Sequence, residues 1–133
     1  MTEHEQIYPI LSRELAEQRK SLAPKPADAF RAFTQSVLAD GALPAKTKQL
    51  IAVAVAHVTQ CPYCIRGHTK AAMQHEATPE EIMEAIWVAA EMRAGGAYAH
   101  SALALDTIAR DKAEKAGAHE KAASVREADA KQA

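Results

Sequence analysis

One segment of the chain, from Leu50 to Val58, is apolar at every position except His57. Prolines at positions 44 and 62 flank it and limit where a helix can begin and end. A helix that is apolar on every side is buried on every side. We therefore expect a helix that begins near Pro44, ends before Pro62 and forms the centre of the domain or of its oligomer. It is too short to cross a bilayer, which takes about 20 apolar residues, and we expect no membrane partner.

The rest of the chain is also predicted to be helical. Alanine, the best helix former, supplies 31 of the 133 residues, whereas glycine supplies only five. No run of alternating β-branched residues indicates a strand. We predict an all-α, single-domain bundle of about six helices. Because alanine buries little apolar area, the core of one chain would be thin, and we expect an obligate homo-oligomer.

Helix boundaries can be placed from spacing and capping residues. Apolar residues at helical spacing predict a first helix over residues 5–22 and a second from about Pro26 to Leu38. A fourth helix is expected from Cys61 or Pro62 to about His75.

The fifth helix has the clearest start in the chain. Thr78 is the predicted N-cap, Pro79 occupies the first helical position, and Glu81 completes a capping box. Gly95-Gly96 is expected to interrupt this helix, with a sixth beginning at about Ala97. We place the helical domain at residues 1–116 and expect residues 117–133, which are rich in Ala, Lys and Glu, to be a frayed or disordered tail.

Charge and the N-terminal sequence restrict the partners and the compartment. The formal net charge is −1 and no basic stripe is present, so we expect no nucleic-acid partner. The first residues are polar and lack the apolar core of a secretory signal, which predicts a cytoplasmic protein. In a reducing compartment, two cysteines at C-x-x-C spacing are more often redox-active or metal-binding than structural.

The segment from Cys61 to His68, CPYCIRGH, carries the residues that predict chemistry. With Cys61 as N-cap and Pro62 at the first helical position, Cys64 is the third residue of a helix. The unpaired N–H groups and the dipole at a helix start stabilise a thiolate. His68 lies one turn after Cys64 on the same face and could act as its base.

A zinc site is the main alternative. Cys61, Cys64 and His68 could supply three ligands, with His57 or His100 as the fourth. However, the chain has no second C-x-x-C and no H-x-x-x-H, so we favour redox chemistry and predict no metal. Inert buried thiols are a further alternative, and we interpret His57 as a core histidine.

The chain from Lys46 to His68, KTKQLIAVAVAHVTQCPYCIRGH, and from Ala77 to Ala85, ATPEEIMEA, resembles the alkylhydroperoxidase D (AhpD-like) branch of the carboxymuconolactone decarboxylase-like superfamily. The resemblance covers residues 42–105. It implies an AhpD-like helical bundle that forms trimers or hexamers and uses no cofactor. It further implies reduction of a hydroperoxide, with Cys64 as the peroxidatic thiol, Cys61 as the resolving thiol and an external dithiol as the reductant. The true decarboxylases lack this cysteine pair, which argues against lactone decarboxylation.

The resemblance also implies a proton relay that includes His68, and here the sequence departs from the family pattern. The family usually has a glutamate twelve residues before the first cysteine, where this chain has Gln49. An amide cannot accept a proton at neutral pH, so Glu91 and His100 become further relay candidates. The departure keeps a second interpretation open, a thiol–disulfide oxidoreductase or redox sensor without efficient peroxidase activity. A zinc-binding or interaction module is the third.

Overall fold

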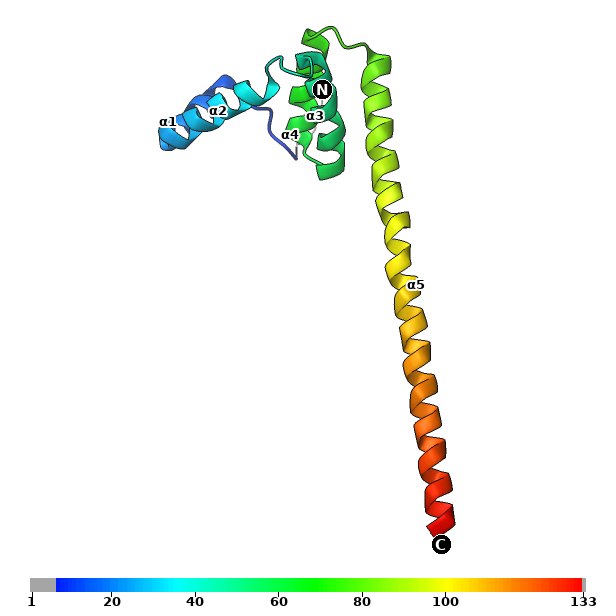
Figure 1. The fold of residues 1–133 in the computed structure, drawn as a ribbon. Helices are drawn as coiled ribbons and strands as arrows, with labels where there is room; N and C mark the ends of the chain where they lie inside the picture. The colour runs from blue at the N-terminus through cyan, green and yellow to red at the C-terminus, as the bar shows by residue number, and fades with distance from the viewer. Residues whose placement is uncertain (1–6, 133) are drawn as a thin grey trace. The chain divides into compact units, whose positions relative to one another are not determined.

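A computed structural model of the protein describes residues 7–132, and five α-helices account for most of them (Figure 1). The helices are α1 (Arg13–Leu22), α2 (Pro24–Leu38), α3 (Ala45–Thr59), α4 (Pro62–Gln74) and α5 (Pro79–Gln132). No strand occurs between residues 7 and 132. The predicted all-α fold is therefore confirmed, with five helices in this part of the chain where about six were expected.

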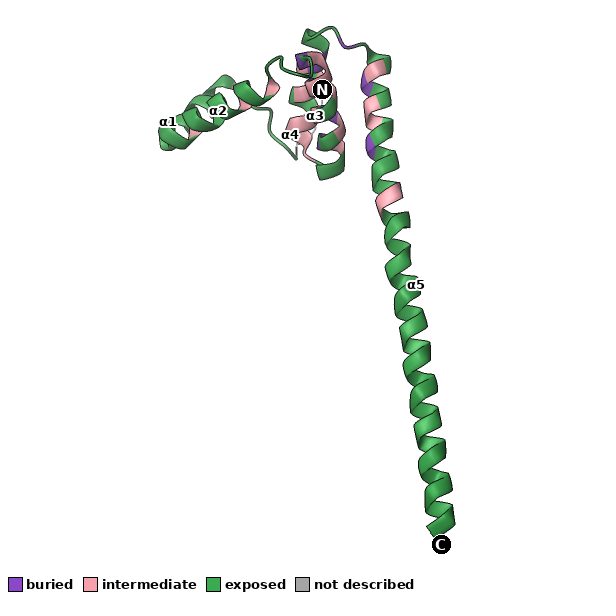
Figure 2. Cartoon of the chain, viewed as in Figure 1, coloured by how far each residue is buried: buried purple, intermediate pink, exposed green. Residues whose placement is uncertain are grey.

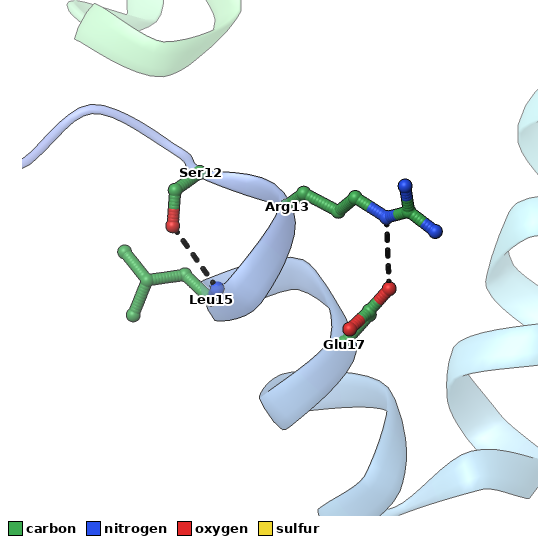
Figure 3. Close-up of polar contacts among 4 residues, drawn as sticks. All are labelled: Ser12, Arg13, Leu15 and Glu17. Carbon is green, nitrogen blue, oxygen red and sulfur yellow. Dashed lines mark hydrogen bonds and ion pairs between the residues drawn. The ribbon is translucent and has the colours of Figure 1, made fainter.

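The first helix begins later than predicted. The Oγ of Ser12 accepts a hydrogen bond from the backbone N–H of Leu15 at 3.2 Å, which makes Ser12 the N-cap (Figure 3). An exposed pair between Arg13 and Glu17, 3.0 Å apart, follows in the first turns. Pro9 disfavours helical geometry before it, so the start predicted at residue 5 is wrong for residues 7–12, and residues 5 and 6 lie outside the described part.

Side-chain contacts connect the end of α2 to the start of α3. Lys48 donates hydrogen bonds through Nζ to the carbonyls of Val37 and Ala39, at 2.9 and 2.7 Å. Asp40 accepts one from the backbone N–H of Ala45 at 2.7 Å, which satisfies a free donor at the start of α3. As predicted, α3 begins directly after Pro44.

The core joins α3, α4 and the first turns of α5 (Figure 2). Its buried apolar side chains are Val53, Ala72, Ala77 and Ile82, with Leu50 and Ile86 packed against them. Most of these side chains are small, as the alanine-rich sequence predicts, so the apolar area that one chain buries is modest.

Only one face of α3 is buried, which corrects the expectation for this helix. Ala45, Gln49, Val53 and Ala56 form the buried face. On the other side, Ile51 and Val55 remain 47% and 53% exposed. Within the first unit, the all-round apolar pattern of α3 is therefore matched by burial on one side only.

The connection from α4 to α5 is fixed by two local motifs. Glu76 has a φ of 64°, and the N–H of Ala77 bonds the carbonyl of Ala72 at 3.0 Å, which is the Schellman arrangement at a helix C-terminus. Thr78 and Glu81 then bond each other's backbone N–H, both at 3.1 Å. The predicted capping box is therefore confirmed.

A salt bridge adds to this second motif. Lys46 on α3 lies 2.9 Å from Glu81. This ammonium, followed by the backbone N–H of Thr78, holds the pKa of Glu81 below its ordinary value.

Helix α5 continues through Gly95-Gly96, so the predicted interruption and the separate sixth helix are wrong. Glycine costs only about 1 kcal/mol against alanine in a helix, and no proline follows Pro79. The chain divides into two compact units, residues 1–91 and 92–133. In the described part of the second unit, every side chain from residue 97 onward is exposed.

Residues 117–132 are helical as well. The domain boundary at residue 116 and the fraying of this end in solution stay predictions. Among the described residues, no helix is both long enough and apolar enough to cross a membrane. The cytoplasmic location also stays a prediction.

Candidate functional site

The tight turn between α3 and α4 determines where the first cysteine lies. Gln60 adopts the left-handed conformation, with φ 57° and ψ 46°. The N–H of Cys61 then bonds the carbonyl of Ala56 at 3.2 Å, the long hydrogen bond of a Schellman motif. This turn ends α3 and reverses the chain within two residues. Cys61 is thereby placed directly before Pro62, the first residue of α4.

Cys61 caps α4 as the sequence predicts. Its Sγ accepts a hydrogen bond from the backbone N–H of Cys64 at 3.2 Å. The two half-buried cysteines form a disulfide across a Cα–Cα distance of 5.2 Å. The pair can therefore close within one turn of helix, and one N–H group at the helix start, that of Cys64, faces the sulfur of Cys61.

His68 hydrogen-bonds Gln49 across the α3–α4 interface. Its Nδ1 lies 2.8 Å from Oε1 of Gln49. Gln49 is the one buried polar side chain in the described core, 6% exposed, whereas His68 is half-buried. Burying an amide without a partner is costly, so the imidazole and the amide satisfy each other.

This hydrogen bond also selects the form of the imidazole. The Oε1 of Gln49 can only accept, so Nδ1 of His68 carries the proton and donates it. Nε2 then keeps its lone pair and is the atom that can take a proton. Gln49 orients the ring as a carboxylate would, but as a neutral group it stabilises the imidazolium less.

The other relay candidates have different surroundings. The side chain of Glu91 is exposed and makes no hydrogen bond or ion pair within the described chain. His100 belongs to the second unit, where its Nδ1 donates to the carbonyl of Gly96 at 2.7 Å. His57 donates in the same way to the carbonyl of Val53 at 2.7 Å, as a satisfied core histidine would. Only Gln49 and His68 are joined directly.

No group of three or more His, Cys, Asp or Glu side chains in residues 7–132 is placed to hold a metal ion. The three candidate zinc ligands have other partners, since Cys61 and Cys64 are bonded to each other and His68 is bonded to Gln49.

Two parts of the site differ in how far the sequence signals them. Gln49 lies four residues after Ala45 and four before Val53, so helical spacing puts it on the same buried face. A polar residue on an apolar face is the sequence signal for a functional role. The turn at Gln60 has no comparable signal, because glycine is the residue that usually marks a left-handed C-terminal position.

Comparisons with known proteins show the family to which the chain belongs. A sequence model of the carboxymuconolactone decarboxylase family matches residues 24–107. The chain belongs to the carboxymuconolactone decarboxylase family. The family consists of enzymes and enzyme-like proteins, and the match includes every helix from α2 to the first half of α5.

The chain is also similar in sequence to individual relatives and to solved structures. An uncharacterized protein of the cox locus in Paracoccus denitrificans is 70% identical over 81 residues, which cover 61% of this chain and 73% of that protein. A carboxymuconolactone decarboxylase family protein from Legionella pneumophila is 40% identical, with a TM-score of 0.55 over 59% of this chain and 70% of that one. A structure from Methanobacterium thermoautotrophicum is 34% identical, with a TM-score of 0.58 over 62% and 92% of the two chains.

Proposed function

We propose that this protein reduces hydroperoxides through Cys61 and Cys64, as a member of the AhpD-like branch of its family. The observation that carries the proposal is the cysteine pair at the start of α4, able to close as a disulfide, on the same helix as His68. Such a site offers a nucleophile, a resolving thiol and a base within two turns of helix.

The reaction would proceed in three balanced steps. Nε2 of His68 takes the proton of the Cys64 thiol, and the thiolate attacks the terminal peroxide oxygen. An S–O bond forms, the O–O bond breaks, and the alkoxide leaves as an alcohol with the proton from His68. Cys64 is then a sulfenic acid, and Cys61 displaces water from it to form the disulfide. An external dithiol restores both thiols by exchange and is itself oxidised.

The geometry at the helix start supports different tasks for the two sulfurs. In the disulfide, the N–H of Cys64 points at Sγ of Cys61. This contact favours Cys61 as the leaving thiolate when the reductant attacks Cys64, because a stabilised thiolate leaves faster.

Two further expectations belong to this proposal. A cytoplasmic location would supply the dithiol reductant. Assembly into trimers or hexamers would cover the apolar face of α3 that carries Ile51 and Val55, both exposed in one chain.

The test is peroxide consumption with tert-butyl hydroperoxide and dithiothreitol. Cys64→Ser should abolish turnover. In a single turnover without dithiothreitol, Cys61→Ser should form no disulfide and should keep one sulfenic acid per chain, which a dimedone probe labels. Both variants should keep the parental circular dichroism spectrum. Parental peroxide consumption by Cys64→Ser would refute the mechanism.

A thiol–disulfide oxidoreductase or redox sensor is the second candidate, and the neutral partner of His68 favours it. Exchange with a disulfide substrate in the absence of peroxide consumption would support this function instead. A zinc-binding or interaction module is the third candidate. A measurement of zinc in protein purified under reducing conditions tests it. Stoichiometric zinc that Cys61→Ser removes would overturn both redox proposals.

A further inference from the structure

A small pocket lies on the face of α4 next to the disulfide. It has a volume of about 250 Å³ and is lined by Ile10, Leu11, Tyr63, Arg66, Gly67 and Lys70. Tyr63 directly precedes Cys64, so one wall of the pocket is continuous with the redox pair. The other wall comes from the segment before α1, and Tyr8 packs edge-on against Tyr63 with ring centroids 6.0 Å apart.

The lining combines two chemical features. Arg66 and Lys70 lie one helical turn apart, and neither has an ion-pair partner or hydrogen-bond acceptor within the described chain. Opposite them, Ile10 and Leu11 leave 64% and 47% of their surface exposed. Among residues 7–132, the pocket therefore presents positive charge without an ion-pair partner beside apolar surface that no described side chain covers.

Gly67 makes the pocket accessible. Apart from its two chain neighbours and the backbone of its own helix, a Cβ added at this position would meet no atom of the described residues within 4 Å, so the space above the helix is open here. A larger residue at position 67 would occupy this space without a clash at its Cβ.

We propose that this pocket binds the carboxylate end of a medium-chain acyl compound. The guanidinium of Arg66 and the ammonium of Lys70 would hold the carboxylate, while Ile10, Leu11 and Tyr63 would cover the first methylenes. Where the proposed peroxide reduction also holds, the preferred substrate class would be alkyl hydroperoxides that carry a carboxylate.

Binding is tested without reference to activity, on the oxidised protein. Octanoate below its micelle concentration should bind saturably, one per chain, in isothermal titration calorimetry. Acetate, which lacks the apolar body, and octanol, which lacks the charge, should each bind at least tenfold more weakly. The double variant Arg66→Gln with Lys70→Gln should lose at least tenfold in octanoate affinity.

Two further variants test whether the effect is specific to the pocket. Lys121→Gln with Arg126→Gln removes the same charges from α5 and should leave octanoate binding unchanged. Gly67→Leu should abolish binding while the circular dichroism spectrum stays parental. The inference is overturned if octanoate shows no saturable binding, if the Arg66/Lys70 double variant binds it as the parent does, or if acetate binds equally well.

A kinetic measurement separates this inference from the proposed function. In the Arg66/Lys70 double variant, the ratio of kcat/KM for a carboxylated alkyl hydroperoxide to kcat/KM for tert-butyl hydroperoxide should fall about tenfold. Octanoate binding in a protein without peroxidase activity would uphold the pocket and refute only the peroxidase.

Discussion

Replacing Gln49 with glutamate changes the partner of His68 from a neutral amide to a carboxylate at the same hydrogen-bond position. The present bond joins Nδ1 of His68 to Oε1 of Gln49 at 2.8 Å. A neutral hydrogen bond contributes about 1 kcal/mol net, whereas one to a charged group contributes roughly 1.5–3 kcal/mol. In the proposed mechanism, the imidazolium that forms when Cys64 loses its proton should therefore gain about 1 kcal/mol. That gain corresponds to roughly a fivefold faster thiolate reaction.

The assay is the stopped-flow rate at which the reduced protein loses its Cys64 thiol to tert-butyl hydroperoxide. Gln49→Glu should raise this rate about fivefold. Gln49→Met, which has a similar length and no acceptor oxygen, should lower it, because the ring is then free to adopt the other tautomer. Gln74→Glu adds the same charge at an exposed position of α4 and serves as the control. Thermal melts confirm that each variant is folded.

Two results would refute this reasoning. Equal rates for Gln49→Glu, Gln49→Met and the parent would show that the contact with His68 has no part in the chemistry. An equal rise in Gln74→Glu would show that added negative charge acts without the contact. Glu91→Gln should react at the parental rate, because Glu91 is exposed and has no partner in the described chain. A loss of rate there would restore Glu91 to the relay.

Further predictions concern stability and assembly. Glu76→Gly should stabilise the fold by about 1 kcal/mol in urea unfolding, because φ at this position is 64° and glycine adopts it without cost; a lower stability would contradict the strain argument. The depressed pKa of Glu81 beside Lys46 contributes stability above the ordinary glutamate range, which is lost as pH falls through that lowered pKa. Glu81→Gln should therefore lose less stability than the parent between about pH 5 and pH 3, and parallel losses would refute this. Ile51→Glu with Val55→Glu should reduce the mass measured by light scattering to that of one chain, and an unchanged oligomer would move the interface elsewhere.

The helix boundaries that the sequence predicts well are those set by local chemistry. Thr78 and Glu81 satisfy each other's backbone donors, and Pro62 must follow a non-helical Cys61, so both starts can be inferred from a few adjacent residues. The length of α5 could not be inferred in this way. Two glycines lower helix propensity by an amount that the surrounding alanine, leucine and charged residues offset, and residue preferences alone do not give the balance.

The two left-handed turns could not be predicted from the sequence, for a related reason. Gln60 and Glu76 both occupy positions where glycine is usual. Their conformation follows from the packing of α3, α4 and the start of α5, since each turn returns the chain to the core at Ala56 or Ala72. Residue preference alone gives no reason to expect a turn at either position.

The buried face of α3 connects the stability of the fold to the chemistry of the site. Ala45, Val53 and Ala56 are apolar there, and Gln49 is the exception. An apolar residue at position 49 would remove the cost of burying an amide, but it would leave Nδ1 of His68 without an acceptor on α3. A glutamate would bind the imidazolium more strongly at the cost of burying a carboxylate. Gln49 lies between these extremes, because it keeps the ring oriented in every charge state. This property would suit the proposed redox function, in which the site is stable both as a disulfide and as a reduced pair.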